Sequence, residues 1–419
     1  MTLGRSRQLF ILTVVVTAAA VLPAPPTEAK SSGPDGAVVR DWTSLAFAAV
    51  RNARATDAAS ARLYAMVDTA MYDAVNGLES HPRWSVFAQP SRGNAGDPVV
   101  AAAAAAHAVL SELYPALQSA YDDQLAHDVG EGSPGQAKHG TAWGERVAAA
   151  VLVARANDGS QPPESRGTGA GPGQYRGTFA GLQYRNLAPF AINDADAYAT
   201  AQPPALESSA YAVAFNDVKA NGNGNVVDSA ASATFQYWSL SGGTNQPPGA
   251  WLQVAAAVSA DRNLSLRDTA RLFALESMAL VDTVAPTYTT KDRYFTWRPI
   301  TAIREANTDD NDATTIDPVW TARGGSSASP EFWSGHSSFS AAGAAVLAGF
   351  FCADNVPFSL TTDSGAGQSR TYNSFSAAAD EAGRSRVLGG LHFEFSNQAG
   401  LTAGRAVAAE VLERERACA

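Results

Sequence analysis

Cysteine is nearly absent from this chain of 419 residues, which contains only Cys352 and Cys418. No Cys-x-x-Cys pair exists, so a zinc site built on thiolates is excluded. An even number of cysteines fits an oxidising compartment, where these two could form a disulfide. A buried Cys352 with an unpaired Cys418 fits the sequence equally well, and both alternatives stay open.

Positive charge is also in short supply. Lysine and arginine together number 30, against 40 aspartate and glutamate residues, which gives a formal net charge of −10. No basic stripe is available to neutralise the phosphates of a nucleic acid, so nucleic acid is excluded as a partner. A local cluster of cations would therefore be an exception to the overall composition.

An apolar run long enough to span a membrane is lacking. The N-terminal run Leu9–Leu22 has about 14 residues, whereas a transmembrane helix needs about 20. Arg5 and Arg7 precede this run, and a small-residue cleavage site follows it after Ala29, which is typical of a signal peptide. The sequence predicts removal of residues 1–29 and a secreted, periplasmic or cell-surface protein without stable membrane insertion.

Alternation of apolar and polar residues, the mark of a half-buried strand, is scarce and is found only in Phe358–Thr362. Apolar residues instead recur at three- and four-residue intervals, which predicts an all-α helical bundle. We expect an N-terminal helical half over residues 30–205, with the Gly/Pro-rich loop Gly159–Gln174, and a C-terminal helical half over residues 206–419. The expected helical segments are Asp41–Gly77, Val99–Tyr114, Gln136–Asn157, Ala210–Asn221, Ser229–Trp238, Gly249–Asp261, Ser265–Ala285, Ala342–Phe351 and Leu401–Arg414.

Three short segments of the C-terminal half together carry the groups needed to hold a tetrahedral oxyanion. They contribute three cations, a Ser-Gly pair with a hydroxyl and backbone N–H groups, and two histidines. Arginine and lysine neutralise a phosphate-like anion through charge-assisted hydrogen bonds, and several oxygens need such partners at once. The candidate site residues are Lys291, Arg298, Ser334, Gly335, His336, Arg386 and His392.

The spacing of the first two segments predicts helix ends at the site. Lys291 and Arg298 are seven residues apart, but Pro299 disfavours helix at Arg298 and favours the start of a new helix after it. Gly335 permits a close backbone approach to a ligand, and the helix that follows His336 would point free N–H groups at an anion.

The third segment points the same way. Arg386 and His392 are six residues apart and cannot share one helical face. Gly389 and Gly390 remove the difficulty, because one helix can end near Arg386 and the next can begin near His392. Each segment alone has an ordinary explanation, such as surface cations or a helix cap, so the combination carries the hypothesis.

The patterns Lys-x6-Arg-Pro, Ser-Gly-His and Ser-Arg-x5-His resemble the shared signature of vanadium-dependent haloperoxidases and type 2 phosphatidic acid phosphatases. The surrounding residues Trp297–Arg304 and Gly390–Asn397 are more similar to the secreted bacterial haloperoxidase branch. The resemblance covers residues 200–412 and implies an all-α fold of two packed four-helix bundles. Two residues depart from the pattern: Trp333 replaces the usual proline before Ser-Gly-His, and Ser396 stands where many phosphatases of this superfamily carry an aspartate.

The resemblance also implies a vanadate cofactor and a role for each site residue. His392 would bind the metal, His336 would act as acid and base, and Lys291 would also polarise the peroxide substrate. The implied reaction oxidises halide with hydrogen peroxide to hypohalous acid, which halogenates a small organic acceptor; a homodimer is compatible with it. Glu276 and Asp282 are the carboxylates expected to hold the arginines. The vanadate oxygens would be held by Lys291, Arg298, Ser334, Gly335, His336 and Arg386.

Two other functions remain open. A secreted acid phosphatase could use the same pocket, with His392 as nucleophile and His336 as the acid that protonates the leaving group. Ser396 argues against it, because a histidine nucleophile profits from a carboxylate on its other nitrogen. Trp333, a bulky residue beside the pocket, leaves room for a non-catalytic oxyanion-binding or scaffold protein.

Overall fold

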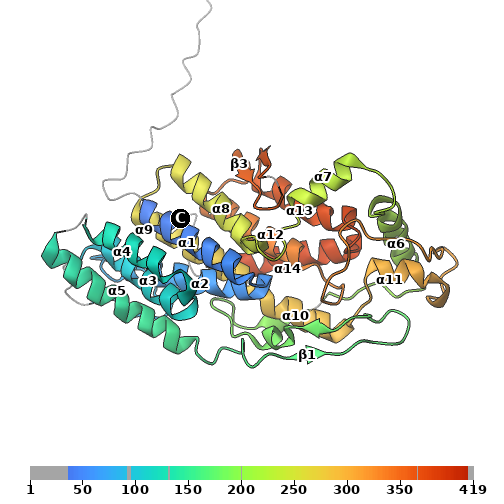
Figure 1. The fold of residues 1–419 in the computed structure, drawn as a ribbon, viewed down its shortest axis with the longest axis horizontal. Helices are drawn as coiled ribbons and strands as arrows, with labels where there is room; N and C mark the ends of the chain where they lie inside the picture. The colour runs from blue at the N-terminus through green and yellow to red at the C-terminus, as the bar shows by residue number, and fades with distance from the viewer. Residues whose placement is uncertain (1–35, 92–95, 131–132, 200, 366, 414–419) are drawn as a thin grey trace, which may run out of the picture. The chain divides into compact units, whose positions relative to one another are not determined.

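The computed structural model describes residues 36–413 apart from 92–95, 131–132, 200 and 366. Helices dominate this part of the chain, and its strands form two short antiparallel pairs (Figure 1). The predicted all-α fold is therefore confirmed. The proposed signal peptide, residues 1–29, and Cys418 lie outside the described residues.

The first half contains the predicted helices, but one of them is broken in two and the helix Gln118–Gly130 was not predicted. The expected segment Asp41–Gly77 is divided, because Arg54 adopts a left-handed conformation and Thr56 caps a new helix by accepting a hydrogen bond from the N–H of Ala59. The second helix therefore begins at Asp57. The elements are α1 (Ala37–Ala53), α2 (Asp57–Asn76), α3 (Pro98–Leu113), the 3₁₀ turn Pro115–Leu117, α4 (Gln118–Gly130), α5 (Pro134–Ala154), β1 (Ser165–Arg166), β2 (Phe179–Ala180) and the 3₁₀ turns Leu182–Asn186 and Ala195–Tyr198.

The second half contains the helices that carry the candidate site. The expected strand Phe358–Thr362 is present as β3 (Phe358–Thr361), which pairs with the unanticipated β4 (Ser369–Tyr372). The helices are α6 (Ser209–Asn221), α7 (Ser229–Tyr237), α8 (Gln246–Asp261), α9 (Leu266–Asp282), α10 (Val284–Tyr294), α11 (Pro299–Arg304), α12 (Gly335–Phe350), α13 (Phe375–Leu388) and α14 (Glu394–Glu413), with a 3₁₀ turn at Ala306–Thr308.

Helix α12 packs against α14, α13, α9 and α8. Its contact with α14 depends on glycine: a Cβ placed on Gly400 would lie 2.5 Å from the carbonyl oxygen of Ser334, and one on Gly404 would collide with the carbonyl of Ser338. Helix α2 packs against α3 and α9, and one hydrophobic core joins residues of α1 and α14, whereas α6 and α11 belong to a second core. The helix ends that form the site are thus held by two hydrophobic cores.

In the described part of the chain, no single helix is both long and apolar enough to cross a membrane. Only α3 together with the following segment Pro115–Gly130 meets the length and composition requirements, and this pair is bent by 118°.

Two carboxyl groups lie in the interior between α2 and α9. Asp68 and Glu276 are 1% and 0% exposed, and neither oxygen of Glu276 has a hydrogen-bond partner among the described residues. Burial raises the pKa of Glu276 well above its usual value, and the nearby Asp68 raises it further. Burial likewise raises the pKa of Asp68 well above its usual value, so folding favours the protonated form of both groups.

Glu276→Gln is expected to reduce the loss of stability as pH rises. Because the pKa of Glu276 is raised by folding, its contribution is fully present below the unfolded pKa and is lost as pH rises towards the folded pKa. Urea unfolding at pH 5 and pH 8 should show a smaller decrease in free energy for the variant than for the native protein. Glu145→Gln, at an exposed position of α5, is the matched control and should leave the decrease unchanged. Equal decreases in native protein and Glu276→Gln would contradict this account.

Candidate active site

A cavity of about 100 Å³ brings six of the seven candidate residues together. Its wall combines residues from the N-termini of α2 and α12, from α10, from the end of α13, and from the turns before α11 and α14. The lining residues are Asp57, Val284, Thr287, Tyr288, Lys291, Arg298, Ser327, Ser329, Gly335, His336, Phe339, Arg386 and His392.

The chain reaches this cavity through the helix breaks that the sequence indicates. Arg298 is extended, with φ −81° and ψ 158°, and Pro299 is the first residue of α11. Helix α13 ends two residues after Arg386, and Gly390 then takes a positive φ of 71° before His392. The hypothesis that several helix ends converge on one ligand site is consistent with this geometry.

His392 is fixed in one neutral tautomer by its neighbours. Nη1 of Arg298 lies 2.9 Å from Nε2 of His392, and a guanidinium can only donate, so Nε2 must carry a lone pair. The proton is then on Nδ1, which lies 3.0 Å from Oε1 of Glu331. Burial and the nearby Arg298 lower the pKa of His392 well below its usual value, which agrees with a neutral ring.

Glu331 is the functional residue that the sequence analysis missed. It is fully buried, and its Oε1 also accepts a hydrogen bond from the N–H of Phe393 at 3.0 Å. The inference that Ser396 leaves His392 without a carboxylate is therefore wrong: Ser396 lies 3.2 Å from Nδ1, and Glu331 supplies the carboxylate from another segment. A glutamate only three residues before Ser334 was the available signal.

The arginine and lysine side chains are buried together. Arg298 donates to the carbonyl oxygens of Ser329 and Leu391, and Lys291 donates to the carbonyl oxygen of Pro330 at 2.5 Å. Burial lowers the pKa of Arg298 to about 10, and burial together with Arg298 lowers the pKa of Lys291 well below its usual value. The mutual repulsion of these cations is relieved when an anion lies between them.

Two N–H groups of Arg386 have no acceptor among the described residues. Among the described residues, its Nε and Nη1 are buried without any hydrogen bond. Burial, followed by the charge of Arg298, lowers the pKa of Arg386 to about 9. A buried polar group without a partner costs about 1–3 kcal/mol, more when charged, so this guanidinium favours an acceptor in the cavity.

His336 lines the same cavity, and its neighbours define its tautomer. Its Nε2 lies 3.1 Å from the carbonyl oxygen of Ser239, which can only accept, so Nε2 carries the proton and Nδ1 the lone pair. Burial and the charge of Arg386 lower the pKa of His336 well below its usual value. The neutral ring can therefore take up a proton at Nδ1.

Ser334 is the candidate residue that does not line the cavity. It caps α12, where its hydroxyl oxygen accepts hydrogen bonds from the N–H and hydroxyl of Ser337, while the next residue, Gly335, lines the wall. The bulky Trp333 is also turned away: its side chain is buried and its Nε1 donates to Thr287. Trp333 therefore does not fill the cavity.

The first half of the chain contributes a carboxylate that was also missed. Asp57, at the start of α2, lies on the cavity wall and accepts a hydrogen bond from the hydroxyl of Tyr288 at 3.4 Å. Burial raises the pKa of Asp57, and the N–H of Ala58 and the charge of Lys291 partly offset that rise. The sequence analysis predicted one continuous helix through this position, so Asp57 was not recognised as the start of a helix.

The proposed arginine partners are not where the sequence analysis placed them. Asp282 accepts hydrogen bonds from the backbone N–H groups of three consecutive residues, Phe190, Ala191 and Ile192. Glu276 has no hydrogen-bond partner among the described residues. The assignment of these two carboxylates to Arg298 and Arg386 is therefore wrong, because both are engaged or enclosed elsewhere in the core.

Asp57→Asn is expected to strengthen phosphate binding. An ionised Asp57 repels an anion held by the cations, so its removal should tighten binding about tenfold at pH 8. The gain should be smaller at pH 5, because the raised pKa of Asp57 leaves more of its carboxyl group protonated there. Isothermal titration at the two pH values measures this, with the exposed Asp123→Asn on α4 as control. No change at either pH would show that Asp57 does not face the bound anion.

The chain is similar to known proteins both in part of its sequence and in its fold. Residues 271–419 match the family model of the VCPO second helical-bundle domain. The structure is similar to the crystal structure of the first bacterial vanadium-dependent iodoperoxidase, with a TM-score of 0.78 and 20% sequence identity over 91% of this chain and 96% of that chain. This chain has the vanadium haloperoxidase fold.

A second haloperoxidase structure agrees. The holo form of a bacterial vanadium-dependent chloroperoxidase has a TM-score of 0.66 and 17% identity, over 84% of this chain and 90% of that chain. None of the curated proteins matches the sequence. The resemblance to vanadium haloperoxidases drawn from the sequence motifs is thus confirmed.

The residues around the oxyanion cavity fit a vanadate ion. Nε2 of His392 carries a lone pair that here accepts a hydrogen bond from Arg298 and would bind vanadium in its place. Nε and Nη1 of Arg386 have no acceptor among the described residues. Lys291 and Arg298 line the same small cavity and add positive charge. This set combines one nitrogen ligand with several donors for oxyanion oxygens.

Proposed function

We propose that the protein is a vanadate-dependent haloperoxidase that oxidises halide with hydrogen peroxide to hypohalous acid. The observation that carries the proposal concerns two residues on one cavity. Nε and Nη1 of the buried Arg386 have no hydrogen-bond partner among the described residues, and His392, which is bound to the carboxyl group of Glu331, carries a lone pair on Nε2. Such a cavity suits a tetrahedral oxyanion that also accepts a nitrogen ligand. The likeness to an iodoperoxidase and a chloroperoxidase structure supports a haloperoxidase over other functions that use a tetrahedral oxyanion.

In this proposal the chain's own residues bind and orient. His392 would be the vanadium ligand through Nε2, with Glu331 fixing its tautomer and increasing its basicity. When bound, vanadate supplies a Lewis acid that activates hydrogen peroxide for attack by halide. Gly335 would offer its backbone N–H at the start of α12, where the helix dipole favours negative charge. The anion would be held by Lys291, Arg298 and Arg386.

His336 would move the protons. Its Nδ1 lone pair accepts a proton from hydrogen peroxide, and its Nε2–H stays bound to the carbonyl oxygen of Ser239. Burial, followed by the charges of Arg386, Arg298 and Lys291, keeps the pKa of His336 low. An anion between these cations would offset their contribution and raise the pKa. Proton uptake by His336 is therefore matched to an occupied cavity.

An acid phosphatase is the second candidate, and Glu331 specifically favours it. The pair formed by Glu331 and His392 resembles the oriented histidine that attack on phosphorus requires. Because Glu331 supplies the carboxyl group, the serine at position 396 does not disfavour attack of His392 on phosphorus. The two functions must be separated by experiment.

The decisive experiment compares both reactions on one preparation. After incubation with vanadate, the protein is expected to oxidise iodide or bromide with hydrogen peroxide and to halogenate a phenol dye. The vanadate-free protein is expected to hydrolyse p-nitrophenyl phosphate at most weakly. Fast ester hydrolysis with no halide oxidation at any vanadate loading would establish the phosphatase instead. Failure of both reactions, with tight oxyanion binding, would leave the non-catalytic binding protein.

Export belongs to the same proposal. Cleavage after Ala29 would deliver the enzyme outside the cytoplasm, where peroxide, halide and organic acceptors are its partners. Mass spectrometry of the protein from the culture medium would give a mature N-terminus at Lys30. An intact Met1 on cell-retained protein would contradict export.

A further inference from the structure

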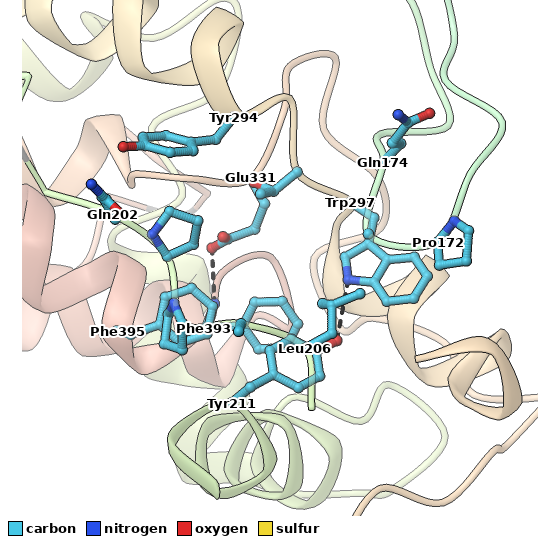
Figure 2. A pocket seen from close by; sticks show the side chains of 15 residues that line it. Pro172, Gln174, Gln202, Leu206, Tyr211, Tyr294, Trp297, Glu331, Phe393 and Phe395 are labelled. Atoms are coloured by element: carbon cyan, nitrogen blue, oxygen red, sulfur yellow. Dashed lines mark hydrogen bonds between the residues drawn. The ribbon is translucent and has the colours of Figure 1, made fainter. Parts of the chain in front are cut away.

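A second, larger cavity lies behind the oxyanion site. It has a volume of about 330 Å³, within the range of small-molecule sites, and shares no lining residue with the first cavity. Figure 2 shows it between the loop at Pro172 and Gln174, the segment that contains Gln202 and Leu206, and Tyr211 of α6. Apart from Glu331, none of its lining residues has a role in the proposed reaction.

Aromatic rings form much of its wall. Phe393 and Phe395 stack with ring centroids 5.1 Å apart, and Tyr211 lies 5.5 Å from Phe393. Trp297 donates its Nε1–H to the hydroxyl of Tyr211 at 3.1 Å, which fixes both rings (Figure 2). Phe393, Tyr211 and Trp297 are at most 2% exposed, so the rings form a rigid apolar wall against which a planar aromatic molecule can pack at little entropic cost.

The charge of the lining restricts the ligand. None of the lining residues is a lysine or arginine, and the one carboxylic acid among them is Glu331. An anion would enter this cavity without a counter-charge, which is costly in a buried site. The cavity therefore selects against the oxyanions that the first cavity attracts.

Glu331 provides a hydrogen-bond acceptor at the cavity. Its Oε1 is used by His392 and Phe393, but its Oε2 is buried without a hydrogen-bond partner among the described residues. In Figure 2 the carboxyl group of Glu331 points towards Phe393 from the side of the cavity opposite Tyr211. A ligand with an N–H or O–H group could satisfy Oε2.

We propose that this aromatic cavity is a binding site for an uncharged, planar aromatic molecule that carries one hydrogen-bond donor, of the size of a phenol or an indole. The rings of Phe393, Phe395 and Tyr211 stack on the ligand, and Glu331 accepts its donor. Because Glu331 also holds His392, the ligand contacts the rear of the oxyanion site without entering it.

Isothermal titration of the vanadate-free full chain with indole tests the proposal. One site with a Kd on the order of 1 mM or tighter is expected for a ligand of this size. Benzoate, a planar anion, should bind at least tenfold more weakly, and 1-methylindole, which lacks the N–H, at least fivefold more weakly. Absence of indole binding, or equal affinity for all three compounds, would overturn the proposal.

Two variants locate the binding. Ala205→Trp places a large side chain at the exposed mouth of the cavity and is expected to weaken indole binding at least tenfold. Ala142→Trp, at an exposed position of α5 away from the cavity, is the matched control and should bind indole like the native protein. Unchanged binding by Ala205→Trp would place indole elsewhere and refute the site. The titration needs neither vanadate nor peroxide, so its result is independent of the proposed reaction.

Discussion

Replacement of His392 by alanine is expected to abolish the retention of vanadate. His392 is the one ring whose lone pair is both directed by Arg298 and backed by a carboxylate, so no neighbour can replace it as a ligand. Metal analysis after desalting should find vanadium in the native protein and none in His392→Ala. Activity should fall with the metal.

His336→Ala is the matched comparison. His336 lines the same cavity, but in our proposal it moves protons and does not ligate, so the variant should keep its vanadium and lose most halide oxidation, on the order of 10²-fold or more. Equal loss of metal from both variants would show that the two roles are wrongly assigned. Circular dichroism of both proteins would show whether the helical fold is kept.

Glu331→Gln is expected to weaken vanadate binding or turnover by about 10–100-fold, as loss of a carboxylate behind a ligating histidine does. The amide keeps the size of the side chain but offers His392 a neutral acceptor, so the basicity of Nε2 falls. A vanadate titration followed by kinetics on the loaded protein separates the effect on binding from the effect on turnover.

Ser396→Ala is the control for that experiment. Its hydroxyl oxygen is the other group near Nδ1 of His392, at 3.2 Å against 3.0 Å for Glu331. If the carboxylate is the group that matters, Ser396→Ala should stay within about threefold of the native protein. A larger effect for Ser396→Ala than for Glu331→Gln would mean that the hydroxyl orients the ring.

Local sequence signals predicted the helices well because their causes are local. Pro299 fixes the break before α11, the two glycines after Leu388 end α13, and Ser265 caps α9. The break at Arg54 was missed because no glycine or proline marks it, and Arg54 adopts its left-handed conformation within an otherwise helical pattern.

The residues of the candidate site were also predictable only where their signal is local. The cations and histidines stand in short motifs, so they could be named from the sequence. Glu331 and Asp57 could not be assigned, because their roles depend on contacts 61 residues away and in another half of the chain, respectively. The same dependence misplaced Glu276 and Asp282, whose helix was correct but whose side chains point into the core.

The glycine contacts between α12 and α14 make one wall of the oxyanion cavity more rigid than the other. With backbone against backbone at Gly400, and with the N–H of Ser334 donated to the carbonyl of Ser396, the start of α12 and the start of α14 cannot slide past each other. Adjustment to anions of different size must then come from the opposite wall. That wall is the irregular segment with Ser327 and Ser329, whose hydroxyls reach Arg298. Changes in anion preference are therefore most readily made in that segment, where the chain can move without separating two helices.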